Sequence, residues 1–305
     1  MFFAPPVAIE SQVFAVLPEE LHAEGPDPEL SAGQPSGISM KSLLEGPSFD
    51  TDGNLYCVDL SAGRVHRVDA GGNFSMVAEY DGWPNGLKIH SDGRILIADY
   101  KNGIMLLDPD TGVVKPYLER ANLERFKAVN DLFFASNGDL YFTDQGLTGH
   151  HDPTGRLFRV DGSGRVTCLL DNVPSPNGLV MNLDETAIYL AVTRANAVWR
   201  VPLNAWGEVT KVGTFVQLSG GNGPDGLALT ADGGLAIAHF GLGCVWVLSE
   251  LGEPLYRVNS PVGPFTTNVA FGGKDNRTLF ITEASSGSIL SAQLEVAGRT
   301  MFSHL

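Results

Sequence analysis

The chain has 305 residues, enough for one large domain or two smaller ones, and its 35 acidic side chains outnumber its 20 basic ones for a net charge of −15. This balance argues against nucleic-acid binding, which requires a basic surface. No apolar run approaches the roughly 20 residues of a membrane span, and the first lysine is Lys41, so the N-terminus lacks the basic region of a signal peptide. We therefore expect a cytoplasmic protein that binds neither nucleic acid nor membrane.

Residues 1–44 stand outside a repeat that fills the rest of the chain. Within them, the stretch at 12–17 has the composition of one β-strand. From residue 45 onward, an Asp-Gly, Asn-Gly or related turn recurs between apolar runs. The turn residues are spaced by 40, 45, 47, 48 and 44 positions: Asp52, Asp92, Asn137, Asp184, Asp232 and Asn276. Regular spacing of this size indicates an array of like units.

Each turn is followed by an apolar strand, and a second strand comes after another Gly or Asn turn. The first strands are expected at 55–58, 95–98, 140–143, 188–192, 235–238 and 279–282, and the second at 65–68, 104–107, 157–160, 198–201, 245–248 and 289–294. Long helical periodicity is nearly absent, although residues 117–128 could hold a short helix. The odd number of cysteines argues against a disulfide framework and a zinc site, and we expect all three as buried apolar side chains: Cys57, Cys168 and Cys244.

Six small antiparallel sheets stacked around an axis satisfy this pattern, so we expect an all-β fold, a six-bladed β-propeller. Because the repeat runs evenly to the C-terminus, residues 1–305 are expected to form a single domain. Residues 1–44 would be an N-terminal extension, and residues 45–305 would form the six blades. The strand at 12–17 is expected to complete the last blade and close the ring, which leaves no open sheet edge.

A polar residue stands seven positions before each turn, or eight in the last unit. These residues are Glu45, Asn85, Asn130, Asn177, Asp225 and Asn268. Equivalent positions on blades converge on the propeller axis, so we expect a ring of oxygen-bearing side chains at one mouth of the central channel. Ca²⁺, Mg²⁺ and Mn²⁺ prefer such ligands. The alternative is that these are ordinary turn residues, which is weakest for Glu45 because Glu is not a favoured turn former.

Four segments carry a resemblance to a known family: Glu45-Gly46-Pro47, Asn130-Asp131, Pro176-Asn177-Gly178-Leu179 and Pro224-Asp225-Gly226-Leu227. Their order and spacing resemble the signature segments of the SMP-30/gluconolactonase/LRE family. The resemblance implies a six-bladed propeller with one catalytic divalent cation, usually Ca²⁺, with Mg²⁺, Mn²⁺ or Zn²⁺ as alternatives. It implies Glu45, Asn177 and Asp225 as metal ligands, with Asn130 binding directly or through water and substrate. Asp225 would also be the catalytic base or nucleophile, and Asn130 would hold the substrate or a water.

Sugar-lactone members of that family often carry an arginine two residues before the Asn-Asp pair, where this chain has Ala128. This departure weakens the case for a simple aldonolactone substrate. The candidate substrate contacts are Asn85, Lys127, Asp131, His150, His151 and Asn268. Adjacent side chains on a strand face opposite sides, which favours a structural role for Asp131. The two histidines lie in a long connection, where the alternative is a solvated loop.

These features predict a metal-dependent hydrolase that acts on carboxylic ester bonds and opens a small lactone, sugar-derived or other, to a hydroxy acid. A phosphotriesterase-type hydrolase could use the same cation, and a non-catalytic propeller could bind a partner on its rim. The inward oxygens disfavour the second alternative, because desolvated oxygens without a cation cost free energy. The expected partner is a small-molecule lactone, and the sequence leaves the oligomeric state open.

Overall fold

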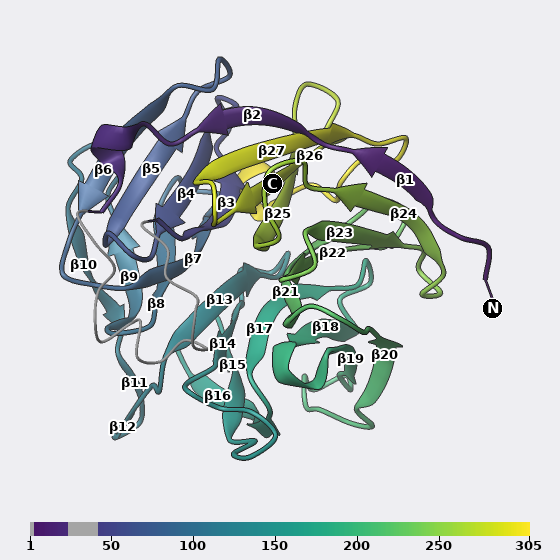
Figure 1. Cartoon of the computed structure of the whole chain (residues 1–305). Helices are drawn as coiled ribbons and strands as arrows, with labels where there is room; N and C mark the ends of the chain where they lie inside the picture. Colours follow the sequence, from purple (N-terminus) through teal and green to yellow (C-terminus); the bar gives the residue numbers. More distant parts are fainter. Residues whose placement is uncertain (1–2, 24–41) are drawn as a thin grey trace.

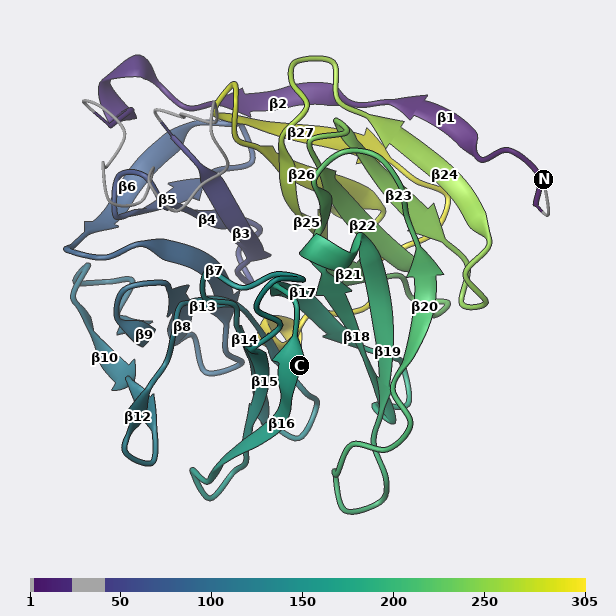
Figure 2. The same cartoon turned by 60° about the horizontal axis from the view of Figure 1, so that its bottom comes forward.

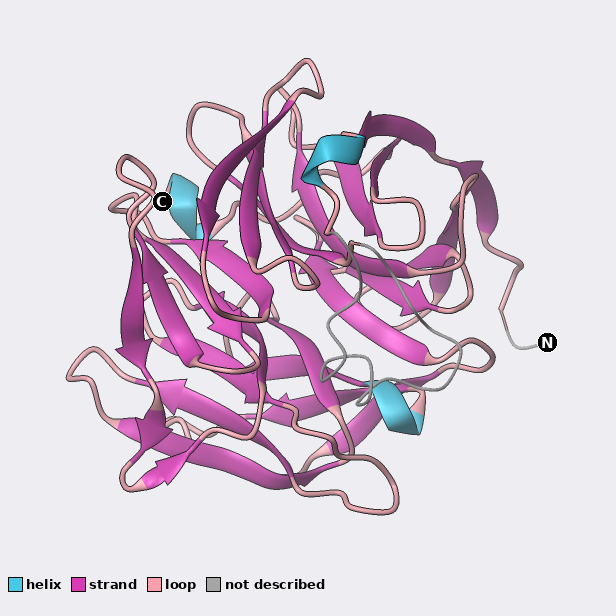
Figure 3. Cartoon of the chain, turned by 60° about the vertical axis from the view of Figure 1, so that its left-hand side comes forward, coloured by secondary structure: helices cyan, strands magenta, loops and turns pink. Residues whose placement is uncertain are grey.

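The computed structural model describes residues 3–23 and 42–305. Figure 1 shows six twisted antiparallel sheets around a central axis, and Figure 3 shows that strands form almost all of the regular structure. The fold is a six-bladed β-propeller, as predicted. The helices of the described ranges are single turns, and none is long and apolar enough to cross a membrane: η1 (Glu19–Leu21), η2 (Thr193–Ala195) and η3 (Phe302–His304).

Each blade is a meander whose first strand lies innermost, so that β3, β7, β13, β17, β21 and β25 surround the axis (Figure 2). The first blade contains β3 (Leu44–Phe49), β4 (Leu55–Asp59), β5 (Arg64–Val68) and β6 (Phe74–Glu79). The second contains β7 (Pro84–Ile89), β8 (Ile95–Asp99), β9 (Gly103–Leu107) and β10 (Val114–Leu118). The third contains β13 (Val129–Phe134), β14 (Leu140–Asp144), β15 (Gly155–Val160) and β16 (Val166–Val173). The fourth blade contains β17 (Pro176–Met181), β18 (Ala187–Val192), β19 (Ala197–Pro202) and β20 (Gly213–Gln217). The fifth contains β21 (Gly223–Leu229), β22 (Leu235–Phe240), β23 (Cys244–Leu248) and β24 (Pro254–Asn259). The sixth contains β25 (Thr266–Gly272), β26 (Thr278–Glu283) and β27 (Ser288–Gln293).

The N-terminal segment closes the ring. Strand β2 (Gln12–Val16) pairs antiparallel with β27 and supplies the outer strand of the sixth blade, which confirms the predicted closure. Strand β1 (Val7–Glu10) was not predicted, and it adds to the outer edge of the fifth blade, parallel to β24. Between the two strands, the backbone N–H of Ser11 donates to Asn259 O at 3.0 Å. The first described residues therefore join two neighbouring blades and cover both outer edges.

The short helix considered for residues 117–128 is not formed. The segment completes β10 and then makes a small hairpin, β11 (Arg120–Ala121) with β12 (Glu124–Arg125). Asn122 has φ of 54° at its turn, which an α-helix does not contain. Phe126 then packs edge-on against Phe142 and Phe158 at 5.1 and 5.3 Å. Aromatic packing against the third blade outweighs the weak helical preference of these residues.

The core consists of six apolar clusters, each shared by two neighbouring blades. One cluster joins the fifth and sixth blades, for example, and another joins the sixth and first. Every strand next to the axis is thus covered on both faces, which explains the apolar runs in the sequence. Cys57 and Cys244 are buried, but Cys168 is exposed, so the prediction of three buried cysteines was wrong for one of them.

His66 is a charge-capable residue inside this core. It lies on β5, fully buried, with Phe74 edge-on at 5.9 Å. Neither ring nitrogen has a hydrogen-bond partner among the described residues. Burial, with a smaller contribution from the positive charge of Arg64, lowers the pKa of His66 to about 4.

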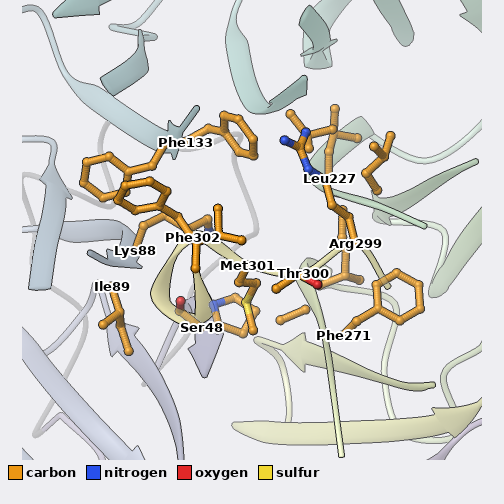
Figure 4. A pocket seen from close by; sticks show the side chains of 18 of the residues that line it. Ser48, Lys88, Ile89, Phe133, Leu227, Phe271, Arg299, Thr300, Met301 and Phe302 are labelled. Carbon is orange, nitrogen blue, oxygen red and sulfur yellow. The ribbon is translucent and has the colours of Figure 1, made fainter. Parts of the chain in front are cut away.

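The C-terminal tail, residues 298–305, crosses the end of the channel where the innermost strands finish. The guanidinium of Arg299 donates to Met181 O at 3.1 Å on the fourth blade, and the Phe302 ring stacks on Phe134 of the third at 5.2 Å. Behind the tail lies a mostly apolar cavity of about 80 Å³ whose lining is drawn in Figure 4, with Phe133, Leu227, Phe271, Met301 and Phe302 among its walls. The tail therefore covers one end of the channel.

Candidate active site

In all six innermost strands, pairing with the next strand is interrupted at the predicted ring position. The register shifts between Glu45 and Ser48 in β3 and between Val129 and Leu132 in β13, and at the equivalent place in the other four. Such a shift is a β-bulge, which redirects the local side chains. The repeat thus places each ring residue in a bulge or directly beside one, at the end of the channel opposite the C-terminal tail.

Five of the six ring residues line one cavity of about 730 Å³: Glu45, Asn85, Asn130, Asn177 and Asp225. All five are at most 7% exposed. The sixth, Asn268, lies behind the wall and donates its amide hydrogen to Glu45 Oε2 at 2.8 Å. Asn85 in turn donates to the backbone carbonyl of Asn130 at 3.1 Å. The structure therefore brings the six residues together, although Glu45 and Asn268 are separated by 223 positions in the sequence.

Two amide oxygens of the ring have no partner. Among the described residues, Asn130 Oδ1 and Asn177 Oδ1 are buried without a hydrogen bond. The amide nitrogen of Asn130 donates to Tyr100 Oη at 2.8 Å and to Gln145 Oε1 at 3.1 Å, which fixes the orientation of the amide. A buried carbonyl oxygen without a partner costs about 1–3 kcal/mol, so this arrangement calls for a ligand.

The two ring carboxylates, Glu45 and Asp225, are buried and repel each other. Burial, followed by the charges of Asp225 and Asp131, raises the pKa of Glu45 well above its usual range. Burial and the charge of Asp131 raise the pKa of Asp225 in the same way, while Asn177 and Arg194 oppose the rise. A cation among these groups would remove the repulsion.

Asp131 lies close to the axis because the bulge in β13 interrupts strict alternation. Its carboxylate accepts a hydrogen bond from Asn268 Nδ2 at 3.4 Å and lies 3.8 Å from Lys88 Nζ. It is buried and does not line the cavity. Its charge therefore raises the pKa of Glu45 and of Asp225, and this electrostatic role fits its position better than contact with a substrate does.

The donor set suits a hard cation. Two carboxylates and two amide oxygens face one cavity, and Ca²⁺ takes such oxygen ligands. The set contains neither His nor Cys, the ligands that Zn²⁺ favours in structural and catalytic sites. In the described part of the chain, no three His, Cys, Asp or Glu side chains gather to hold a metal, so four donors are reached only because amides join the carboxylates.

The remaining predicted residues divide into two groups. His150 and His151 lie at the tip of a tight loop closed by mutual hydrogen bonds between Gly149 and Asp152, and both line the mouth of the cavity. Lys127 does not line it, because its ammonium donates to the backbone and side-chain oxygens of Thr154 at 2.8 and 2.6 Å.

Sequence reasoning missed a second set of lining residues. They share one region of the blade, at the end of the second strand or directly after it, and come from the first five blades: Leu60, Tyr100, Gln145, Thr193 and Phe240. The repeat spacing contained this signal, since the position lies eight residues after the turn residue in four of these blades and nine in the other, but the residue types differ between units. Arg194, next to Thr193, also lines the cavity and was missed for the same reason.

Comparisons with known proteins agree with this architecture. The family model of the SMP-30/gluconolactonase/LRE-like region matches residues 43–285. Lactonase drp35 of Staphylococcus aureus (strain USA300) is 28% identical over 237 residues, 73% of this chain and 72% of that protein. The structure of the calcium-binding protein regucalcin from Agrobacterium tumefaciens strain C58 has a TM-score of 0.78 at 26% identity and covers 99% of this chain and 100% of that one. A gluconolactonase from Xanthomonas campestris has a TM-score of 0.74 at 19% identity, over 97% of this chain and 98% of that one, which shows the shared fold. Because the family model spans well over half of its residues, the chain belongs to the SMP-30/gluconolactonase/LRE-like family.

Proposed function

We propose that this protein is a cation-dependent lactonase, a hydrolase that adds water to the carbonyl of a small cyclic ester and releases a hydroxy acid. The observation that carries the proposal is the pair of unpartnered amide oxygens, on Asn130 and Asn177, beside two buried carboxylates in one cavity. The relative drp35 is named a lactonase, and the regucalcin neighbour is named a calcium-binding protein, which supports the combination of lactone and cation.

Glu45, Asn130, Asn177 and Asp225 would hold the cation, and Ca²⁺ suits them best. When bound, it supplies a Lewis acid that polarises the lactone carbonyl and stabilises negative charge on its oxygen. Binding of the cation would also stabilise the ring, because the amide oxygens would acquire a partner and the repulsion between the carboxylates would fall.

Asp225 would act as the general base. It accepts a proton from the attacking water as the new carbon–oxygen bond forms, and it returns the proton to the ring oxygen as the ester bond breaks. Because Asp225 would also hold the cation, it would be a weak base in bulk terms, so its role depends on holding the water close to the lactone carbonyl. Asn130, held by Tyr100 and Gln145, would position the substrate or the water, and such positioning supplies much of the rate in an enzyme with few reacting groups.

The test is a pH-stat assay of acid release from a panel of aldonolactones, aromatic lactones and aliphatic lactones. Protein stripped with chelator would be supplied in turn with Ca²⁺, Mg²⁺, Mn²⁺ or Zn²⁺. We expect release that depends on the cation, fastest with Ca²⁺. Ca²⁺ at one hundred times its dissociation constant should also raise the free energy of unfolding by about 2.7 kcal/mol, which denaturant titration measures independently of turnover.

Asp225→Asn should reduce kcat by at least about a thousandfold, a loss in the range seen when a principal catalytic group is removed, while the circular dichroism spectrum stays unchanged. Asp184→Asn is the matched control, because Asp184 is an exposed turn carboxylate with the same chemistry. Near-normal kcat in Asp225→Asn would remove Asp225 from the mechanism. Absence of acid release from every lactone with every cation would refute the proposed activity.

A further inference from the structure

Arg194 places a permanent positive charge at the cavity, and the proposed hydrolysis assigns it no role. Of the described residues that line the cavity, it is the only arginine or lysine. Its side chain is exposed, and within the described ranges no hydrogen bond or ion pair engages the guanidinium. The protein has a net charge of −15, so it contains many carboxylates with which an arginine could form an ion pair. An arginine without a partner, pointed at a binding cavity, is available to a ligand.

The backbone that carries Arg194 is held rigidly between two blades. The N–H of Thr193 donates to Ser175 O at 3.0 Å, and its hydroxyl donates to Pro224 O at 2.8 Å. Gly223 packs so closely that an added Cβ would stand 2.1 Å from Thr193 O. This anchoring distinguishes Arg194 from an ordinary surface arginine, because a ligand would not have to immobilise the main chain.

The charge of Arg194 reaches the reacting end of the cavity. Its field lowers the pKa of Asp225 and of Tyr100, against the larger effect of burial, so the guanidinium lies near both groups. On its other side, the γ-carbon of Arg194 lies against Gly149, whose added Cβ would be 3.6 Å away. Arg194 therefore stands between the ring and the loop that carries His150 and His151.

This position bears on the family departure at Ala128. The side chain of Ala128 cannot contact a substrate oxygen through a charge, and Lys127 beside it is engaged with Thr154. This chain therefore presents a guanidinium to the cavity from Arg194 in the fourth blade, and none from position 128 beside the third blade. A planar guanidinium forms paired hydrogen bonds with a carboxylate more strongly than with hydroxyl groups, because both partners are charged.

We propose that the cavity selects lactones that carry a carboxylate, and that Arg194 binds this carboxylate at the mouth while the ester carbonyl lies at the oxygen ring. The inference rests on the proposed lactonase function, which it narrows to an anionic substrate class. Arg194 is thus a specificity-determining residue.

The test compares two five-membered lactones, one with a carboxylate on the carbon next to the ring oxygen and one with a carboxamide there. In wild-type protein supplied with Ca²⁺, kcat/KM for the carboxylate should exceed that for the carboxamide by about tenfold or more, as a charge-assisted paired contact implies. Arg194→Met should bring the ratio of the two kcat/KM values close to one, mostly through a higher KM for the carboxylate lactone. Arg194→Lys should keep part of the preference, and Arg120→Met, an exposed arginine on β11, should keep all of it.

A binding measurement separates this inference from the catalytic proposal. Calorimetric titration of the carboxylate lactone into Asp225→Asn, with and without Arg194→Met, reports binding when turnover is absent. If the wild-type protein hydrolyses no lactone but the carboxylate lactone still binds in a manner that depends on Arg194, the proposed lactonase function is refuted and the anionic ligand class is supported. Hydrolysis of both lactones at equal rates, unchanged by Arg194→Met, would overturn the inference and leave the lactonase in place.

Discussion

Replacement of His66 by leucine should change how stability depends on pH. The folded protein holds the pKa of His66 near 4, below its ordinary value of 6.5, so between these values the unfolded chain binds more protons than the native one. Stability supplied by the neutral ring is complete above pH 6.5 and is lost as the pH falls toward 4. At about 1.4 kcal/mol per pH unit, the loss between pH 7 and pH 5 is about 2 kcal/mol.

His66→Leu removes this proton linkage while keeping a side chain of similar volume next to Phe74. It also removes two buried nitrogens that lack partners among the described residues. Urea unfolding of both proteins at pH 7, 6 and 5 gives the difference in the free energy of unfolding at each pH. Effects of the buried carboxylates on stability are common to both proteins and cancel. We expect the difference to shift in favour of His66→Leu by about 2 kcal/mol from pH 7 to pH 5.

Val65→Ala is the control, because Val65 is a buried neighbour on the same strand and does not titrate. Its destabilisation relative to wild type should be the same at every pH. Parallel pH profiles for wild type and His66→Leu would refute the reasoning, since they would show that His66 binds protons equally in the folded and unfolded states.

Two further variants test the packing that shapes the channel. Phe302→Ala should lower the free energy of unfolding by about 2 kcal/mol in denaturant titrations, because the ring stacks on Phe134 at 5.2 Å and meets His90 edge-on at 4.9 Å; a loss no larger than that of the exposed Leu305→Ala would contradict it. Gly223→Ala should cost more than about 2 kcal/mol in the same assay, because Gly223 has φ of 128° and its new methyl group would collide with Thr193 O. Gly162→Ala, with open space around it and no positive φ, should be nearly neutral, and equal effects of the two glycine variants would rule out this account.

Much of the fold was predictable because the local signals repeat. Six turns with Asp, Asn or Gly fixed the hairpins, and the apolar runs after them fixed the strands. Strand β1 escaped prediction because a four-residue strand at a sheet edge has little sequence signal. The hairpin at residues 120–125 escaped because its conformation depends on where Phe126 packs in the third blade.

The candidate site was predictable where residue types agree between units. The ring residues share oxygen chemistry at one phase of the repeat, so their convergence could be expected from spacing alone. Tyr100, Gln145 and Arg194 share a region of the blade but no chemistry, and only the folded structure shows that they face the same cavity. The bulge beside Asn130 could not be foreseen either, and it is the reason that Asp131 lies near the axis despite strand alternation.

The attachment of the first strands to the last blades has a consequence for synthesis on the ribosome. Gln12 pairs with Ser291, and Val7 pairs with Tyr256, so the partners of β1 and β2 are synthesised long after these two strands. At ordinary elongation rates of about 5–20 residues per second, the N-terminal strands wait on the order of tens of seconds for their places. During that interval the growing chain holds unpaired β-edges that could join a neighbouring nascent chain on the same messenger RNA. Slow translation should therefore favour misassembly between copies, because β1 and β2 can dock only after the fifth and sixth blades have been synthesised.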